Sequence, residues 1–401
     1  MDSADRFSEI ARSFQASEIR ELMKLLGRPG LITFAGGMPD EEHFPHPEII
    51  SIIESLTPAQ RAAAYQYGPT PGYPPLLEAL SSYLLEKGIR CGSDNLIVTT
   101  GAQQALHLVA RILLDPQDVV IVEDPSFIGA MNAFLSFRAL LVGVPILSDG
   151  PDLERLEKAV KLHSSRLKFV YVIPNFQNPS GITYSLEKRR LLLEMAEKHD
   201  FLILEDDPYC ELFFEGEETV YRSLKSMDDH ERVIYLGTFS KTLAPGFRIG
   251  YAVASKTIKE KMELAKQSVD ACSPSFSQVV AAEYLKRGLC AHYVASMRRV
   301  YHDKCRTMLD VLERELPSTV SFTRPKGGFF IWLTLPTGAD ARTVFQECVE
   351  HGVAFVTGAG FCIEAKGEER IRLAFSNASL MDIKKGTALL CSVLRKYYPP
   401  R

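Results

Sequence analysis

The residues with the clearest chemical potential lie between Thr238 and Arg248. Lys241 follows the hydroxyl side chains of Thr238 and Ser240 at the end of a short apolar run, and Arg248 comes seven residues later, beyond a Pro-Gly break. A desolvated lysine beside other cations can form a Schiff base with an aldehyde, and an arginine fork suits a dianionic phosphate. A lone lysine is more often solvated on a surface loop. Its neighbours here favour an aldehyde that carries a phosphate.

Two further segments contain residue types that would complete such a site. Asp206 ends an apolar run, where a carboxylate could keep a pyridine nitrogen protonated or could equally cap the next turn. Gly101, Ala102 and Gln103 open a predicted helix, whose free backbone N–H groups suit a phosphate. A glycine at a strand-turn-helix junction is more often purely structural, so this second segment is weak evidence by itself.

Repeated short apolar runs, rich in β-branched residues, position these side chains. The runs are Leu96 to Thr100, Val119 to Val122, Leu140 to Val144, Lys168 to Ile173, Phe201 to Leu204, Val233 to Leu236 and Ile249 to Val253. Amphipathic helical stretches such as Ala102 to Leu114 and Ser185 to His199 separate several of them. The alternation predicts an α/β domain with a mostly parallel seven-stranded sheet between helices. Ligands bind outside the carboxyl ends of such strands, so we expect the polar segments to line one crevice there.

The flanking segments predict two smaller units. Residues 320–335 place a Lys-Gly-Gly turn between strand-like runs, and a helix near 341–351 and strands around Val353 and Ile371 follow. This pattern is typical of a small α+β domain. Before the large domain, Ser17 to Leu26 predicts a helix on an N-terminal arm that packs near the small domain. We therefore expect an arm at 1–44, a large domain at 45–290 and a small domain at 291–401.

Composition favours a folded protein that binds small molecules. Of the 401 residues, 46% are hydrophobic and 24% charged, with a net charge of -4, so no basic balance suggests nucleic acid or a membrane surface. The first 15 residues are charged where a signal peptide needs an apolar run, and no window reaches the length of a membrane helix, which predicts a cytoplasmic location. The eight cysteines are scattered without metal-ligand spacing, so we expect reduced thiols and no metal.

Four segments together carry a resemblance to a known family. They are Ser240 to Gly250 (SKTLAPGFRIG), Asn178 to Gly181 (NPSG), Asp206 to Tyr209 (DDPY) and Arg372 to Ser376 (RLAFS). In these segments, and along nearly its whole length, the chain resembles the class I/II aminotransferases of fold type I, which use pyridoxal 5'-phosphate. It is similar to their 2-aminoadipate and kynurenine/aminoadipate branch in the segments ASEIREL (16–22), FAGGMP (34–39), QYGPTPGY (66–73) and RPKGGF (324–329).

The resemblance implies a set of cofactor contacts. Lys241 is expected to form the cofactor aldimine and to move the substrate proton, and Asp206 to pair with the pyridine nitrogen. Asn178 and Tyr209 are expected to hydrogen-bond the phenolic oxygen, and Phe127 to stack on the ring. The residues expected at the phosphate are Gly101, Ala102, Gln103, Thr238, Ser240 and Arg248, joined by Tyr67 from the partner subunit of a homodimer.

The resemblance also implies a substrate site. Arg372 is expected to bind the α-carboxylate with both arms of its guanidinium, although an arginine is more often in a surface ion pair. Gly36 or Gly37 would let the backbone approach the substrate, and Asn178 and Tyr67 would lie nearby. Arg20 falls where this branch uses an arginine on a mobile helix to meet a side-chain carboxylate, but it could equally be solvated.

Two positions depart from the family pattern. The branch usually has serine at Ala102 and tyrosine at Phe127, so this chain loses one hydroxyl contact to the phosphate and one hydrogen-bonding tip over the ring. We expect lower cofactor affinity with the chemistry intact.

The expected reaction moves the amino group of an L-amino acid to a 2-oxo acid, with 2-oxoglutarate as the acceptor, by ping-pong kinetics. Aminoadipate, glutamate, leucine and aromatic amino acids are the candidate donors. One alternative is a lyase or decarboxylase on the same scaffold, because the cofactor supports several reactions. Another is a regulatory module fused to a DNA-binding head. Only about 30 residues precede Phe34, which is too short for such a head and argues against this alternative.

Overall fold

The computed structural model describes residues 6–13, 30–364 and 367–399. The predicted helix from Ser17 to Leu26, and with it Arg20, lies outside the described residues. A short helix α1 (Glu9–Ser13) is described before that gap.

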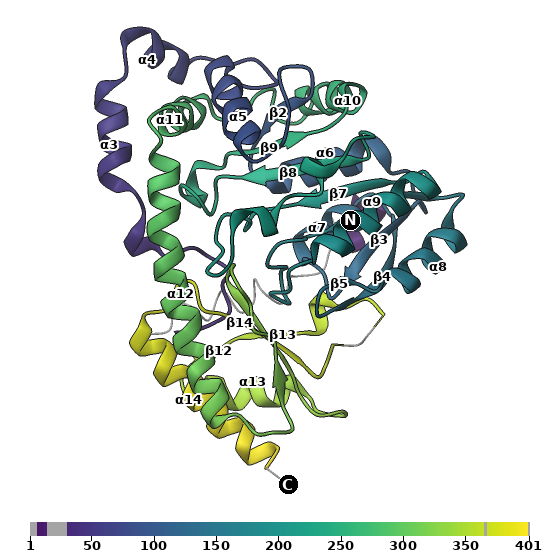
Figure 1. The fold of residues 1–401 in the computed structure, drawn as a ribbon, viewed down its shortest axis with the longest axis vertical. Coiled ribbons are helices and arrows are strands. Elements are labelled where there is room, and N and C mark those ends of the chain that lie inside the picture. Colours follow the sequence, from purple (N-terminus) through teal and green to yellow (C-terminus); the bar gives the residue numbers. More distant parts are fainter. Residues whose placement is uncertain (1–5, 14–29, 365–366, 400–401) are drawn as a thin grey trace.

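A large mixed sheet forms the centre of the protein (Figure 1). Its strand order is β2-β9-β8-β7-β6-β3-β4-β5. The bounds are β2 Leu96–Thr99, β9 Gly250–Val253, β8 Val233–Thr238, β7 Leu202–Asp206, β6 Leu167–Val172, β3 Val119–Asp124, β4 Leu140–Leu147 and β5 Gly150–Pro151. Only β9 and β5 run against the other strands. The seven predicted runs are all strands, and β5 adds a short eighth at the edge.

Helices cover both faces of this sheet because its strands are apolar on both sides. Val120 and Val122 of β3 pack in one core with α6 (Ala102–Leu113), α7 (Ile128–Leu135) and α10 (Lys256–Gln267). Val119 and Ile121 of the same strand pack in another core, with α8 (Leu153–His163) and α9 (Leu186–His199). Since successive side chains of a strand point to opposite faces, a continuous apolar run suits this buried position.

A second group of helices connects the large sheet to the C-terminal part of the chain. Helices α3 (His46–Ser55), α4 (Pro58–Tyr65) and α5 (Pro74–Glu86) pack against α11 (Ser275–Lys286). The long α12 (Leu289–Glu315) then runs down to α14 (Leu380–Tyr397), as Figure 1 shows. Short 3-10 helices lie at Glu41–His43, Glu218–Tyr221, Lys225–Met227, Pro245–Phe247 and Ala359–Phe361.

A smaller antiparallel sheet lies at the C-terminal end of α12. Its order is β10-β11-β14-β13, formed by β10 Ser321–Phe322, β11 Phe330–Thr334, β14 Arg370–Ala374 and β13 Val356–Thr357. Helix α13 (Ala341–Glu350) falls where a helix is predicted. Strand β1 (Ile32–Thr33) pairs with β12 (Val353–Ala354), which supports the arm that we propose at 1–44. We propose the large and small domains at 45–290 and 291–401; the boundary between them falls in the first turn of α12.

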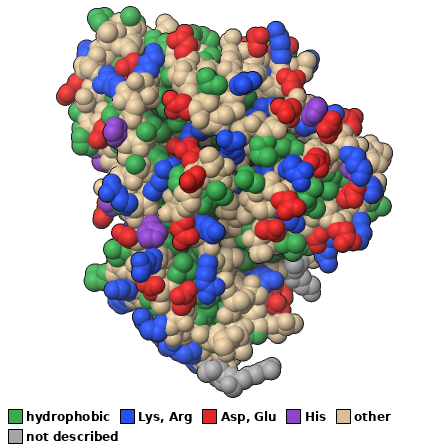
Figure 2. All heavy atoms as spheres, in the orientation of Figure 1, with side chains coloured by type: hydrophobic (Ala, Val, Ile, Leu, Met, Phe, Trp, Pro, Cys, Tyr) green, Lys and Arg blue, Asp and Glu red, His purple; other side chains and the backbone are tan. Residues whose placement is uncertain are grey.

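The surface mixes both signs of charge. Figure 2 shows Lys and Arg interspersed with Asp and Glu over most of the face drawn. Within the described ranges, no helix combines the length and the apolar character that a membrane crossing requires.

Candidate active site

A cavity of about 390 Å³ lies where the carboxyl ends of several strands meet the smaller sheet. Asn178 follows β6, Asp206 ends β7, and Lys241 follows β8, while Arg372 enters from β14. The predicted site residues that line this cavity are Gly36, Gly37, Ala102, Gln103, Phe127, Asn178, Asp206, Tyr209, Thr238, Ser240, Lys241, Arg248 and Arg372. The structure thus brings together segments that are far apart in the sequence, at the sheet edge where ligands bind.

Lys241 presents its amine to the cavity, and no carboxylate among the described residues pairs with it. Its Nζ donates a hydrogen bond to the Gly37 carbonyl oxygen at 2.9 Å. Burial, with the nearby cations Arg248 and Arg372 acting in the same direction, lowers the pKa of Lys241 to about 8. A much larger fraction of this amine is therefore neutral near pH 8 than for an ordinary lysine, which is the state needed to attack an aldehyde.

Asp206 is a buried carboxylate, and only one of its two oxygens accepts a hydrogen bond from a described residue. Its Oδ2 accepts a hydrogen bond from the Tyr171 hydroxyl at 2.9 Å, whereas its Oδ1 is buried and has no partner among the described residues. Burial raises the pKa of Asp206 to about 7, against the opposing effect of the Tyr171 hydrogen bond. An unpaired buried carboxylate oxygen is costly unless a ligand supplies a donor. A protonated pyridine nitrogen is such a donor, so this residue fits a pyridine cofactor.

The start of α6 and the loop after β8 form an anion-binding cup. Gly101 precedes α6 with a φ of +75°, and no side chain caps the helix. A Cβ atom at Gly101 would collide with the Arg248 guanidinium, so only glycine lets that cation approach the turn. The Thr238 Oγ1 lies 3.0 Å from the Ser240 Oγ at the same edge. Free helix amides, hydroxyls and a guanidinium together fit a phosphate.

Arg372 is held on the opposite wall of the cavity. Its Nη1 donates to Asn178 Oδ1 at 2.9 Å and its Nη2 to the Ala35 carbonyl oxygen at 2.6 Å. Its Nε has no partner in the part of the chain that the structure describes. The guanidinium carbon lies 4.5 Å from the ring centre of Phe330 and 4.9 Å from that of Phe361. Burial lowers the pKa of Arg372 to about 10, which leaves it cationic at neutral pH. A buried arginine with this unused donor suits a carboxylate ligand.

Sequence reasoning missed several of the residues on the cavity wall. They are Met38, Leu106, Ile173, Pro208 and Phe330. The Phe330 ring packs over Arg372, and a Cβ atom at Gly37 would lie 2.7 Å from it. The only signal for Phe330 was its place directly after the quoted segment 324–329, because an apolar side chain carries no chemistry of its own.

Two predicted residues do not line the cavity of this chain. Gly101 lies behind it, in contact with Arg248. Tyr67 is 87% exposed and lines a separate cavity of about 550 Å³ with Thr100 and Asp270. The contribution of Tyr67 to a partner's site therefore stays a prediction.

Comparison with known proteins identifies the family. Residues 34–388 match the aminotransferase class I and II family. The chain belongs to this family. An aromatic-amino-acid aminotransferase of Thermococcus litoralis is 38% identical over 400 residues, 99% of this chain and 95% of that relative. A 2-aminoadipate transaminase of Thermus thermophilus is 39% identical over 393 residues, 98% of this chain and 97% of the relative.

The solved structures agree with this assignment. A kynurenine aminotransferase of Pyrococcus horikoshii, in complex with PMP, superposes with a TM-score of 0.94 at 39% identity, covering 99% of this chain and 98% of the other. The aminotransferase is thus a fold type I enzyme whose cofactor is pyridoxal 5'-phosphate and whose reaction transfers an amino group from an L-amino acid to a 2-oxo acid.

The pKa of Lys241 leads to a testable pH dependence. Only the neutral amine attacks an aldehyde, so covalent uptake of pyridoxal phosphate by the apoenzyme should accelerate as the pH rises to about 8 and level off above it. Stopped-flow absorbance between pH 6 and about pH 11 measures this rate. A rate that keeps rising beyond pH 10, as for the amine of a free lysine, would show that the cavity leaves the pKa of Lys241 unchanged.

Proposed function

We propose that this aminotransferase takes its amino group from L-amino acids with acidic, aliphatic or aromatic side chains, such as 2-aminoadipate, glutamate, leucine and aromatic amino acids, and passes it to 2-oxoglutarate. The observation that carries the proposal is the buried, cationic Arg372 on the same cavity as Lys241, with one donor still unpaired. The names of the relatives, an aromatic-amino-acid aminotransferase and a 2-aminoadipate transaminase, support this range of donors.

The residues on the large-domain side would hold the cofactor. Asp206 Oδ1 would accept the pyridine N–H, and Phe127 would cover the ring. Asn178 and Tyr209 would face the phenolic oxygen. When bound, pyridoxal phosphate supplies an aldehyde that takes up the amino group and a ring that stabilises negative charge at the substrate α-carbon. The phosphate would be held by Gly101, Ala102, Gln103, Thr238, Ser240 and Arg248, and the missing hydroxyls at Ala102 and Phe127 would lower the affinity.

The residues on the other wall would orient the substrate. Arg372 would bind the α-carboxylate, with Asn178 on its Nη1 and the Phe330 ring against its face. Gly36 and Gly37 would leave room for the substrate. Lys241 Nζ, once free, would move the α-proton of the donor to the cofactor in the first half of the reaction, and a proton back to the α-carbon of the second substrate in the other half. Because the cofactor would keep the amino group between the two substrates, ping-pong kinetics is expected. Arg20 would meet an acidic side chain of the substrate.

A homodimer and a cytoplasmic location complete the proposal. Tyr67 is 87% exposed, and this exposure supports a role in which its hydroxyl reaches the phosphate and substrate of the partner subunit. All eight cysteines are free thiols, which agrees with a reducing compartment.

The test is a half-reaction titration of the enzyme loaded with pyridoxal phosphate. We expect the band at roughly 360 to 430 nm to shift to roughly 330 nm with L-2-aminoadipate, glutamate, leucine and aromatic donors. Arg372→Lys should lower kcat/KM for these donors at least about 30-fold, because one ammonium cannot replace two parallel donors in a buried site. For a primary amine that lacks the carboxylate, the same substitution should lower kcat/KM much less.

The matched control is Arg395→Lys, which changes a partly exposed arginine paired with Glu315. It should leave kcat/KM unchanged. A bound cofactor that responds to none of the donors would refute the proposed donor range, and an unchanged kcat/KM in Arg372→Lys would refute the role of Arg372.

A further inference from the structure

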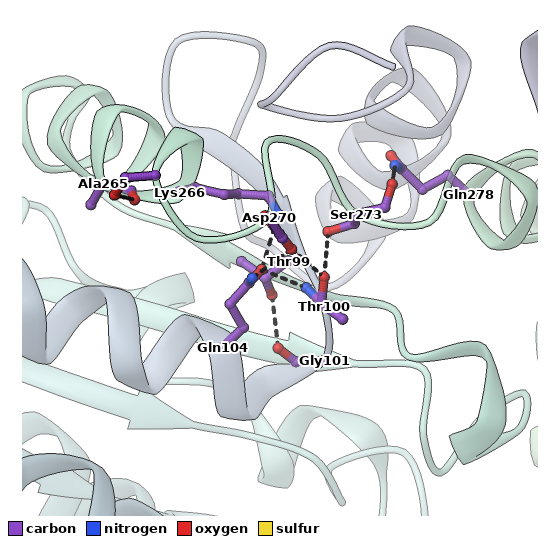
Figure 3. Close-up of polar contacts among 10 residues, drawn as sticks. Thr99, Thr100, Gly101, Gln104, Ala265, Lys266, Asp270, Ser273 and Gln278 are labelled. Carbon is purple, nitrogen blue, oxygen red and sulfur yellow. Dashed lines mark hydrogen bonds and ion pairs between the residues drawn. The ribbon is translucent and has the colours of Figure 1, made fainter. Parts of the chain in front are cut away.

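A partly buried ion pair lies next to the turn that begins α6, outside the lining of the main cavity. Lys266, in the last turn of α10, is fully buried and lies 2.6 Å from Asp270 Oδ1. Figure 3 shows the pair beside Gln104 and Thr100, where β2 ends and α6 begins. None of these four residues lines the main cavity.

Three hydrogen bonds fix the side-chain amide of Gln104 between the two charges. Its Oε1 accepts from Lys266 Nζ at 3.0 Å, and its Nε2 donates to Asp270 Oδ2 at 2.6 Å. The same Oε1 accepts from the backbone N–H of Thr100 at 2.8 Å. An amide held by a cation at its oxygen and a carboxylate at its nitrogen has only one favourable orientation.

The carboxylate also holds the turn through a second atom of Thr100. Asp270 Oδ2 accepts from the Thr100 hydroxyl at 2.7 Å, and that hydroxyl lies 3.1 Å from Ser273 Oγ. Thr100 is therefore held by its backbone and its side chain, immediately before Gly101, whose φ of +75° turns the chain into α6.

The pair is nearly neutral as a unit, so its charge contributes little to the field at the cup. Burial lowers the pKa of Lys266, and Asp270 opposes this shift. Burial raises the pKa of Asp270, yet the hydrogen bonds from Lys266, Gln104 and Thr100 outweigh it and lower the pKa overall. Each group thus favours the charged form of the other.

We propose that Lys266 and Asp270 are positioning residues for the cofactor phosphate: through Gln104 and Thr100 they hold the turn 100–103 in the geometry that aims the first backbone N–H groups of α6 into the cup. The proposal rests on the phosphate site assigned under the proposed function. Neither residue lines the main cavity. Lys266 alone would be a fully buried unpaired charge and Asp270 alone a partly exposed one, and either would disturb the turn.

The test compares the affinity of the apoenzyme for pyridoxal phosphate and for pyridoxal, which lacks the phosphate. Lys266→Met and Asp270→Asn should each lower the affinity for pyridoxal phosphate at least about tenfold, which is the usual effect of losing an outer positioning partner. Affinity for pyridoxal should change less than about twofold, because pyridoxal makes no use of the cup. The readouts are spectral titration and the ³¹P chemical shift of the bound cofactor.

The two substitutions change the net charge in opposite directions, so they distinguish a positioning role from an effect of long-range charge. If the pair acted only by long-range charge, Lys266→Met would weaken and Asp270→Asn would tighten pyridoxal phosphate. Tighter binding by Asp270→Asn, unchanged binding in both variants, or equal losses for pyridoxal and pyridoxal phosphate would each overturn the proposal. If either variant fails to fold, Gln104→Met is measured by the same criterion. It leaves the ion pair and its direct hydrogen bond to the Thr100 hydroxyl in place, and removes only the amide that links the pair to the Thr100 backbone N–H.

Two controls accompany these variants. Lys259→Met breaks a second lysine pair on α10, in which Nζ lies 2.6 Å from Glu263 Oε2 and makes no hydrogen bond to Thr100 or Gln104. It should leave both affinities unchanged. Arg248→Gln removes the cation of the cup itself. If Arg248→Gln lowers the affinity for pyridoxal phosphate while the Lys266 and Asp270 variants do not, only this inference is refuted. If Arg248→Gln also has no effect, the proposed phosphate site is refuted.

Discussion

Lys241→Ala is expected to lower the rate of transamination at least about 10⁴-fold, because the variant loses both the amine that bonds to the cofactor and the base that moves the substrate proton. It should still bind pyridoxal phosphate without a covalent bond, through Asp206 and Arg248. Borohydride reduction followed by mass spectrometry would then find the cofactor attached to wild-type protein only. Single-turnover absorbance with L-2-aminoadipate measures the loss of rate.

Lys259→Ala is the matched control for Lys241→Ala, since Lys259 is also largely buried but lies on α10 outside the cavity. It should retain the wild-type rate. A small primary amine added to Lys241→Ala should restore part of the activity, because it can act as the missing base. A Lys241→Ala enzyme that works within tenfold of wild type would contradict the central assignment of the site.

Asp206→Asn is expected to lower the rate about 10³-fold. Stabilisation by preorganised charge is worth about this much at a single position, and a neutral amide cannot keep the pyridine nitrogen protonated. Asp207→Asn is the control, because Asp207 is a neighbouring buried carboxylate that contacts Asn175 and does not line the cavity. It should lose stability and keep most of its activity. Equal losses of rate in both variants would contradict the role of Asp206.

The same variant has a pH signature in the apoenzyme. In the folded protein the pKa of Asp206 is raised from 3.8 to about 7 by burial, so its stabilising contribution is complete below about pH 4 and is lost as the pH rises through about 7. The amide of Asp206→Asn does not ionise, so the variant does not lose this stability as the pH rises. The melting temperature of the apo variant should therefore rise relative to wild type between pH 4 and pH 8. A constant difference would show that Asp206 ionises normally in the folded apoenzyme.

Most of the fold could be predicted because local patterns already encode it. The β-branched runs predicted seven strands, and a helix expected near 341–351 is α13 (Ala341–Glu350). The short β5 (Gly150–Pro151) escaped prediction because two residues, one of them proline, carry no periodic pattern. Its strand pairing depends on the neighbouring β4 and not on its own sequence.

The candidate reactive groups could be proposed from the sequence, because Asp206, Lys241 and Arg372 lie in or next to apolar runs, and the structure places all three around one cavity. The site around them was less readable. Phe330 contributes only an aromatic face. The Lys266–Asp270 pair has the i,i+4 spacing of an ordinary helical ion pair, and only the structure places it against Thr100. Such residues act through their neighbours, and sequence separation hides those neighbours.

The sequence by itself determined the candidate residues and their order along the strands, and from these we predict a lysine that binds an aldehyde, a carboxylate for a pyridine and a group of donors for a phosphate. Only the tertiary structure decided the pKa values and the hydrogen bonds of these groups. Burial brings Lys241 to a pKa of about 8 and Asp206 to about 7, and it leaves Asp206 Oδ1 and Arg372 Nε without partners. The physical reason is that desolvation and hydrogen-bond pairing depend on residues from distant segments, which meet only when the two sheets pack together.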